Sequence, residues 1–115
     1  MRTVTLGVSS IEETQRQMAT AFGGEKVGEF ISFATVELLW KVLTAKRWDI
    51  LKAMTGQGEM TIREIARRVD RDVKAVHGDV QALLVAGVLD RADSGRVFFP
   101  YDAVHVDFTL SKAAA

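Results

Sequence analysis

The sequence predicts a single α+β domain, and three observations lead to this prediction. The length of 115 residues suits one globular domain. Near both ends, apolar residues alternate with polar ones, which is the two-residue period of a half-buried strand. In the middle, apolar residues recur every three or four positions, which is the period of an amphipathic helix. A content of 48% hydrophobic and 26% charged residues is typical of a folded chain.

The composition excludes several kinds of site and location. The chain has no cysteine, which excludes disulfides, thiolate nucleophiles and cysteine-ligated zinc. No apolar run approaches the roughly 18 residues of a membrane-spanning helix. Polar residues interrupt the apolar positions at the N-terminus, so we expect no signal peptide. These features predict a cytoplasmic protein that makes no membrane contact.

The charges balance along the whole chain. Fifteen Lys and Arg residues face fifteen Asp and Glu residues, for a formal net charge of zero. Residues 1–56 hold seven basic and six acidic side chains, and residues 57–115 hold eight and nine. Any nucleic-acid surface must therefore come from local geometry, with basic side chains on one face and acids elsewhere. This near balance leaves one copy of the chain with little net positive charge for DNA, which favours binding by two copies on a two-fold site.

The first part of the chain is expected to form a strand, a helix and a second strand. Residues 3–8 alternate apolar and polar positions, which predicts a strand. Ser9 or Ser10 can cap a following helix over residues 11–22, which has a thin apolar face and ends at two glycines. Residues 30–34 are expected to form another short strand.

Two helices are predicted next, over residues 36–43 and 45–54. Thr44 is the expected N-cap of the second helix, and glycines follow its end. Trp40 and Trp48 both lie within the apolar helical pattern, so we expect them in the core.

Residues 60–87 carry the most informative pattern. Thr61 and Glu64 form a capping box that opens a short amphipathic helix. After a four-residue break, Asp72 caps a longer helix that ends at Gly87. Its expected buried face comprises Val73, Val76, Val80, Leu83 and Leu84. Helices of about eight and fourteen residues joined by a tight turn are the layout of a helix-turn-helix.

A predicted hairpin follows the second of these helices. Residues 88–91 and 96–99 are the expected strands, and residues 93–95 the turn. The order of three helices and a hairpin predicts a winged helix-turn-helix over residues 31–101. The expected additions are an N-terminal strand-helix extension at residues 1–30 and a C-terminal strand and tail at residues 102–115.

These residues also resemble a known family. The resemblance rests on Met60-Thr-Ile-Arg-Glu-Ile-Ala-Arg-Arg-Val69, Val73-Lys-Ala-Val-His-Gly-Asp-Val80 and the stretch from Leu83-Leu84 to Gly87-Val88-Leu89. They look like MarR-type winged-helix transcriptional regulators, most of all the short prokaryotic DNA-binding antitoxins similar to TumA, the partners of TumE-type toxins. The resemblance implies binding of double-stranded operator DNA as a homodimer, and neutralisation of a co-encoded toxin.

The resemblance has one departure. MarR-type regulators carry long terminal helices for dimerisation and ligand binding, whereas this chain has one modest N-terminal helix. We therefore do not expect a ligand-sensing pocket.

Helix geometry selects the candidate DNA contacts. The face opposite the apolar stripe of the second helix carries Lys74, His77, Gly78 and Gln81. Lys74 can reach a phosphate or a guanine, and the amide of Gln81 suits adenine. Gly78, which lacks a side chain, would let the backbone approach the groove closely.

Further candidates flank this helix. Arg71 precedes its N-terminal end, where base edges are usually contacted. Arg63 and Arg67 share a face of the preceding helix and suit phosphates. Ser94 and Arg96 belong to the wing and suit the minor groove or the backbone. The alternative is that all of these are solvated surface residues.

No pattern predicts an enzyme, a metal site or a cofactor. His105 and Asp107 alternate on one strand but lack a third ligand. No serine has the context of a nucleophile elbow, and no glycine-rich phosphate loop is present.

Two questions stay open at this point. A winged helix used only for protein contacts is the alternative function, and an apolar recognition face would favour it. The two terminal strands could pair with each other, extend the wing's sheet or cross to a second subunit. We expect residues 1–30 and the last strand to form the dimer contact, the toxin contact or both.

Overall fold

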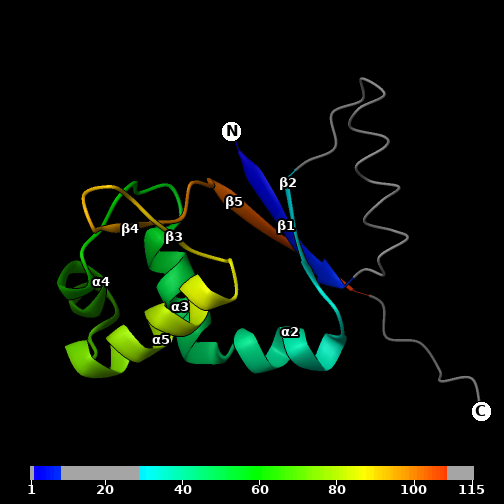
Figure 1. The fold of residues 1–115 in the computed structure, drawn as a ribbon, viewed down its shortest axis with the longest axis horizontal. Helices are drawn as coiled ribbons and strands as arrows, with labels where there is room; N and C mark the ends of the chain where they lie inside the picture. Colours follow the sequence, from blue (N-terminus) through cyan, green and yellow to red (C-terminus); the bar gives the residue numbers. More distant parts are fainter. Residues whose placement is uncertain (1, 9–28, 109–115) are drawn as a thin grey trace, which may run out of the picture.

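The computed structural model describes residues 2–8 and 29–108, and the predicted helix at residues 11–22 lies outside these ranges. The described residues form an α+β fold, as predicted, and their strands make two sheets (Figure 1). The elements, in order, are β1 (Thr3–Val8), β2 (Glu29–Phe33), α2 (Val36–Val42), α3 (Ala45–Met54), α4 (Ile62–Val69), α5 (Val73–Val85), β3 (Asp90–Arg91), β4 (Val97–Phe98) and β5 (Ala103–Asp107).

The larger sheet joins strands from both ends of the chain. Its order is β2-β1-β5, and both pairings are parallel. Leu6 in the central strand aligns with Ile31 on one side and Val106 on the other. Of the three alternatives for the terminal strands, the structure shows mutual pairing, separate from the sheet of β3 and β4. This sheet lies to one side of α3, α4, α5 and the hairpin, with α2 running beneath it in Figure 1.

One apolar core joins the sheet to the helices. Val4 and Leu6 of β1 are fully buried in the same cluster as Leu39 of α2 and Leu83 of α5. The predicted boundary at residues 30 and 31 cuts through β2. The first strand is therefore part of the core of the domain, and not a separable extension.

Arg2 ties the starts of the three parallel strands together. Its guanidinium pairs with Glu29 at the start of β2 and lies 5.1 Å from the centre of the Tyr101 ring. Its backbone N–H donates to the Asp102 carboxylate at 2.8 Å, just before β5.

The predicted caps of α3, α4 and α5 are present, and the predicted cap at Ser9 or Ser10 lies outside the described residues. The Thr44 hydroxyl accepts a hydrogen bond from the Arg47 N–H, and the Asp72 carboxylate accepts one from the Ala75 N–H. Thr61 and Glu64 form the predicted capping box at the start of α4. These caps satisfy N–H groups that a helix start leaves without a partner.

The buried face of α5 is narrower than predicted. Val76, Val80 and Leu83 are buried and Leu84 is partly buried, but 43% of Val73 is exposed. The predicted burial of Val73 is wrong. Val73 is the first residue of α5, and this end of the helix extends past the core.

The two tryptophans differ in their surroundings. Trp48 is partly buried and packs against the core. Trp40 is 47% exposed, so its predicted core position is wrong. Its ring meets Phe108, just after β5, edge to face at a centroid distance of 5.5 Å. Trp40 therefore covers the end of the sheet from outside.

The hairpin is shorter than predicted. Arg91 pairs with Val97, and Gly95 closes the turn with a φ of 88°. Val88 and Leu89, expected in the first strand, are instead buried residues of the turn after α5. Met60 exchanges two backbone hydrogen bonds with Val97, which ties the hairpin to the start of α4.

Candidate nucleic-acid interface

A tight turn sets α5 against α4. Asp70 ends α4 in the left-handed conformation with a φ of 54°, and the Arg71 N–H donates to the Ala66 carbonyl at 3.0 Å. Asp72 then caps α5. Asp is among the few non-glycine residues that accept this conformation at low cost. The turn therefore fixes the direction in which α5 leaves α4.

Three of the four candidate residues on α5 face the solvent. Lys74, His77 and Gly78 are exposed. The side chains of Lys74 and His77 make no hydrogen bond or ion pair to any described residue. A Cβ added at Gly78 would meet no heavy atom within 4 Å. Lys74, His77 and Gly78 thus form a solvent-exposed face of α5.

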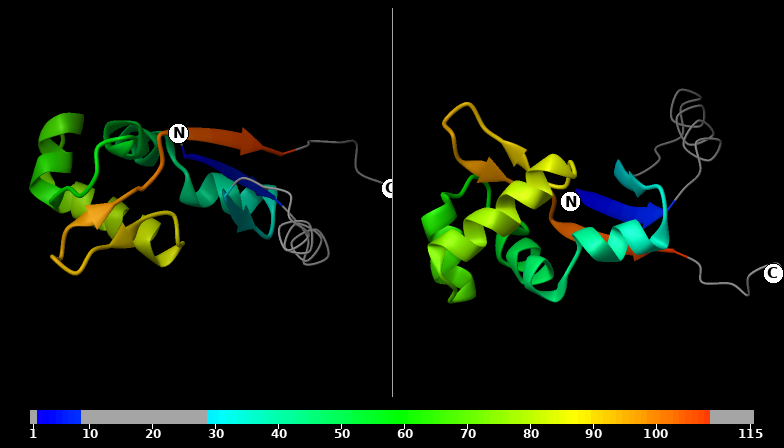
Figure 2. Two further views of the ribbon diagram at one scale, coloured as in Figure 1. Left: turned by 90° about the horizontal axis from the view of Figure 1, so that it is seen from above. Right: turned by 60° about the horizontal axis from the view of Figure 1, so that its bottom comes forward.

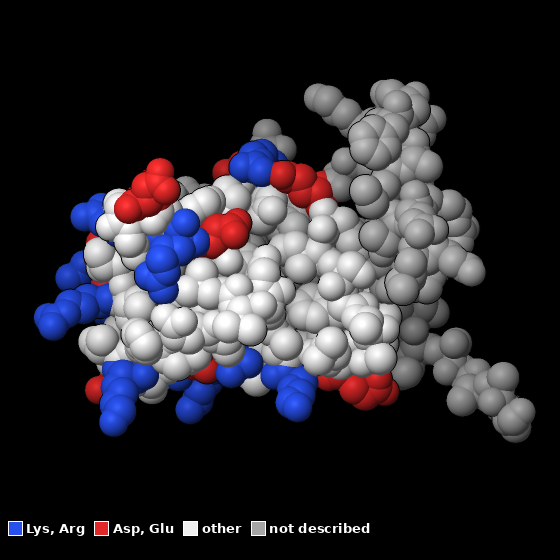
Figure 3. Space-filling model, viewed as in Figure 1, with Lys and Arg blue, Asp and Glu red and all other residues white. Residues whose placement is uncertain are grey.

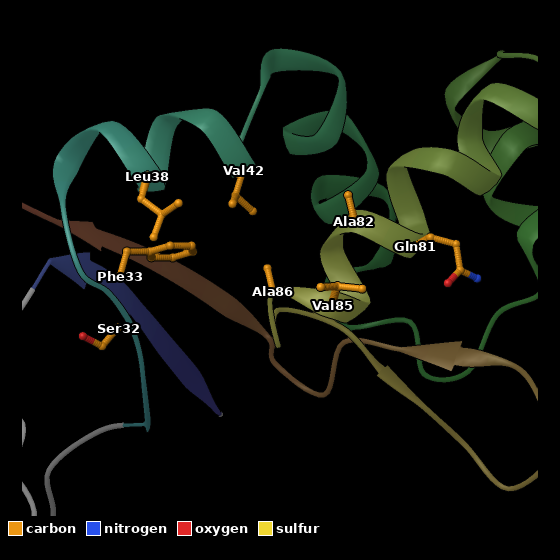
Figure 4. Close-up of a pocket in the computed structure, with 8 residues that line it drawn as sticks. All are labelled: Ser32, Phe33, Leu38, Val42, Gln81, Ala82, Val85 and Ala86. Carbon is orange, nitrogen blue, oxygen red and sulfur yellow. The ribbon is translucent and has the colours of Figure 1, made fainter.

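Gln81 lies differently from the other three. It is half-buried and lines a groove beside α2 (Figure 4). In Figure 4 its amide group points away from Phe33 and Leu38.

Two arginines extend the exposed basic surface onto α4. Arg63 and Arg67 are exposed, and neither side chain is paired within the described parts of the chain. The hairpin loop, α4 and the N-terminal end of α5 all reach the same end of the molecule (Figures 1 and 2). Figure 3 shows Lys and Arg gathered at this end and along the adjoining lower edge.

Arg71 is placed differently from the prediction. Its guanidinium pairs with the Asp79 carboxylate at 2.8 Å, and Arg47 of α3 pairs with the other oxygen at 3.0 Å. Only 19% of the Arg71 side chain is exposed. The charge of Arg71 is thus paired within the domain, whereas the sequence predicted a side chain directed at DNA. We name these three residues the Arg47–Asp79–Arg71 cluster.

The cluster holds Asp79 in its charged form. Burial of this side chain raises the pKa of the carboxyl, but the hydrogen bonds from Arg71 and Arg47 lower it more. The net result is a pKa below the ordinary value. Asp79 therefore stays ionised and holds α5 to α3 and to the turn before it.

The hairpin candidates divide into one free and one engaged side chain. The Ser94 hydroxyl donates to the Glu59 carboxylate at 2.7 Å and accepts from the Arg96 backbone N–H at 3.3 Å. Ser94 therefore fixes the loop. The Arg96 guanidinium is exposed, and nothing in the described ranges pairs with it.

One comparison with known proteins gives a match. The family model HVO_A0114 matches residues 42–106, which is more than half of the chain. The chain belongs to the HVO_A0114 family. The span that the family shares runs from the end of α2 into β5, so it contains the turn between α4 and α5, the hairpin and every candidate DNA contact. No curated protein matches the chain.

Two residues of the HVO_A0114 span were not found by sequence reasoning. Arg47 and Asp79 are 32 positions apart in the sequence. No sequence pattern predicts an ion pair between residues that far apart. Only the packing of α3 against α5 brings them together.

The described residues do not assemble a metal site. His105 and Asp107 are exposed on β5, and no group of three potential metal ligands occurs among residues 2–8 and 29–108. None of the described helices is long and apolar enough to cross a membrane.

Proposed function

We propose that this chain is a sequence-specific DNA-binding transcriptional regulator, with residues 31–101 acting as a winged helix-turn-helix, and that it binds operator DNA as a homodimer. The observation that carries the proposal is the convergence of three elements at one end of the molecule. There the hairpin, α4 and the start of α5 present exposed basic side chains that make no hydrogen bond or ion pair to a described residue, namely Arg63, Arg67, Lys74 and Arg96. Basic side chains on a protruding helix are the usual means of contacting phosphates and base edges.

The exposed residues take distinct roles in this proposal. Arg63 and Arg67 bind phosphates, and Arg96 contacts the backbone or the minor groove. Lys74 and His77 reach base edges in the major groove, and Gly78 allows close approach of α5. Gln81, which is half-buried, contacts DNA through its amide group.

Two further residues support the contacts without making them. Arg71, through Asp79, fixes the angle of α5. Ser94 fixes the hairpin loop.

The polarity of the exposed face supports DNA over a protein ligand. Protein-binding faces are depleted in charge at their centre. The centre of the face on α5 carries Lys74, His77 and Gly78 instead. The two exposed large apolar residues of α5, Val73 and Val85, lie at the first and last positions of the helix and not at the centre of this face.

Titration of a fluorescent duplex from upstream DNA, repeated across salt concentrations, tests this function. We expect sequence preference and a steep loss of affinity with salt. Arg67→Ala should weaken binding to all sequences and reduce the salt slope by about 1, whereas Lys74→Ala should cost about 1–3 kcal/mol and relax specificity. Lys52→Ala removes an exposed charge from the last turn of α3, outside the proposed DNA contacts, and is the matched control. No binding at low salt, or variants at α4 and α5 that bind like the control, would reject the proposal.

We also propose, from the resemblance to TumA-like regulators, that the chain acts as an autoregulating antitoxin. The test is expression of the neighbouring reading frame alone and together with this chain. Growth arrest that co-expression relieves, with a complex that co-purifies, is the expected result. A harmless neighbour would end the antitoxin role and leave the DNA-binding role unaffected.

A further inference from the structure

An apolar groove lies between α2, the end of β2 and the C-terminal half of α5 (Figure 4). Its volume is about 510 Å³. In Figure 4, Leu38 points from α2 toward Phe33, and Val85 and Ala86 approach from α5. The lining is completed by Ser32, Val42, Gln81 and Ala82.

The groove has exposed apolar side chains at its border. Val85 is 88% exposed and Leu38 is 42% exposed. Apolar side chains grouped on a surface mark sites of interaction. A protruding valine beside an apolar groove offers both parts of a two-fold contact, since each copy can supply one knob and one hole.

The charged side chains on α2 of one copy can pair with those on α2 of a second copy related by a two-fold axis. Glu37 and Lys41 are exposed and lie one helical turn apart. By helical spacing they form a strip adjoining Leu38 and Val42, which line the groove. When two copies of α2 lie antiparallel, Glu37 of each copy faces Lys41 of the other.

We propose that a second copy of this chain docks in this groove, with the two α2 helices antiparallel and Val85 of each copy entering the groove of the other. The inference rests on the proposed function in that it assigns the surface of the homodimer. The groove lies toward the sheet, away from the end formed by α4, the hairpin and the start of α5, so docking leaves the basic end free (Figure 1).

The first test is the dimer dissociation constant of the full chain without DNA, measured by sedimentation equilibrium. Val85→Asp should raise this constant at least tenfold, because it places two charges in an apolar contact. Val73→Asp is the matched control, since it changes an exposed valine at the other end of the same helix. Circular dichroism of both variants, at a concentration where each is monomeric, should show the helix content of the wild-type fold, because neither valine belongs to the buried core.

The second test exchanges the charges of α2. Glu37→Lys and Lys41→Glu should each weaken the homodimer, because each places like charges opposite each other. The double variant E37K/K41E should restore it, and so should an equal mixture of the two single variants. Pairing within one helix cannot explain rescue by mixing, so this outcome separates the two-fold contact from a local ion pair.

Several results would overturn the inference. These are a wild type that stays monomeric, a Val85→Asp dimer as tight as the control, and single charge variants that mixing does not rescue. A Val85→Asp variant that dimerises but no longer binds the neighbouring gene product would assign the groove to that protein instead. A groove-dependent dimer that fails to bind DNA would reject only the proposed function. A two-copy DNA complex that survives Val85→Asp would reject only the docking surface.

Discussion

At the residue scale, the Asp79 carboxylate accepts hydrogen bonds from two guanidinium groups, one from α3 and one from the turn before α5. The three side chains of the Arg47–Asp79–Arg71 cluster are between 18% and 22% exposed, so water screens them only in part. Loss of the shared acid would leave two cations close together beside the start of the proposed recognition helix.

Asp79→Asn should destabilise the domain by about 1–3 kcal/mol at pH 7, because charged hydrogen bonds are lost. The folded pKa of Asp79 is lowered, so its stabilisation is present above the unfolded pKa of about 3.9 and disappears as pH falls through the folded pKa. The free-energy difference between wild type and variant should therefore be full at pH 7 and shrink below about pH 4. Urea unfolding at several pH values measures it, and a constant difference would contradict this account.

Gly78→Ala and Gly7→Ala should act in opposite directions. At Gly78 the added methyl group has open space, and replacing a helical glycine stabilises by about 0.5–1 kcal/mol. At Gly7 the added Cβ would lie 2.6 Å from the Asp107 carbonyl oxygen and 2.9 Å from the Phe30 ring, which forces the strands apart. Thermal unfolding should show a gain for the first and a loss of about 1–3 kcal/mol for the second.

The same Gly78→Ala variant carries a functional expectation. If α5 enters the major groove at this position, the added methyl group should weaken DNA binding although the protein becomes more stable. Equal or tighter binding by Gly78→Ala would show that the backbone at residue 78 does not approach the DNA.

At the element scale, α4 depends on its capping box. Thr61→Ala removes the hydroxyl that accepts from the Glu64 N–H, which should cost about 1 kcal/mol. Hydrogen bonds from the Thr61 backbone and hydroxyl lower the pKa of Glu64, so the same change should move that pKa toward its ordinary value. Titration followed by NMR measures the pKa, and Thr61→Ser should preserve both properties.

Local signals explain which elements the sequence could predict. Caps act within one turn of the chain, so Thr44, Thr61 and Asp72 correctly marked three helix starts. The ring of Trp40 meets Phe108, which lies 68 positions later in the chain. No local pattern encodes such a contact.

The same difference between local and long-range contacts applies to the candidate site. Helical spacing correctly predicted that Lys74 and His77 face the solvent. It could not predict that Arg71 is withdrawn, because the Asp79–Arg47 pair depends on how α3 packs against α5.

At the scale of the whole molecule, β1 lies at the centre of the larger sheet and also contributes to the core of the helices. Leu6→Ala should therefore destabilise the entire domain, by about 2–5 kcal/mol. Unfolding followed by circular dichroism and by tryptophan fluorescence should give one coincident transition in both wild type and variant. A fluorescence transition that shifts alone would indicate that sheet and helices unfold independently.

The pairing of β1 with β5 has a consequence for biosynthesis. Thr3 aligns with Ala103, so one edge of the first strand stays unpaired until residues 103–107 have left the ribosome. Until then the nascent chain exposes a free strand edge beside apolar side chains, the arrangement that promotes association between chains. A message truncated within the hairpin would release such a chain permanently. Pairing with β5 therefore removes the free edge of β1.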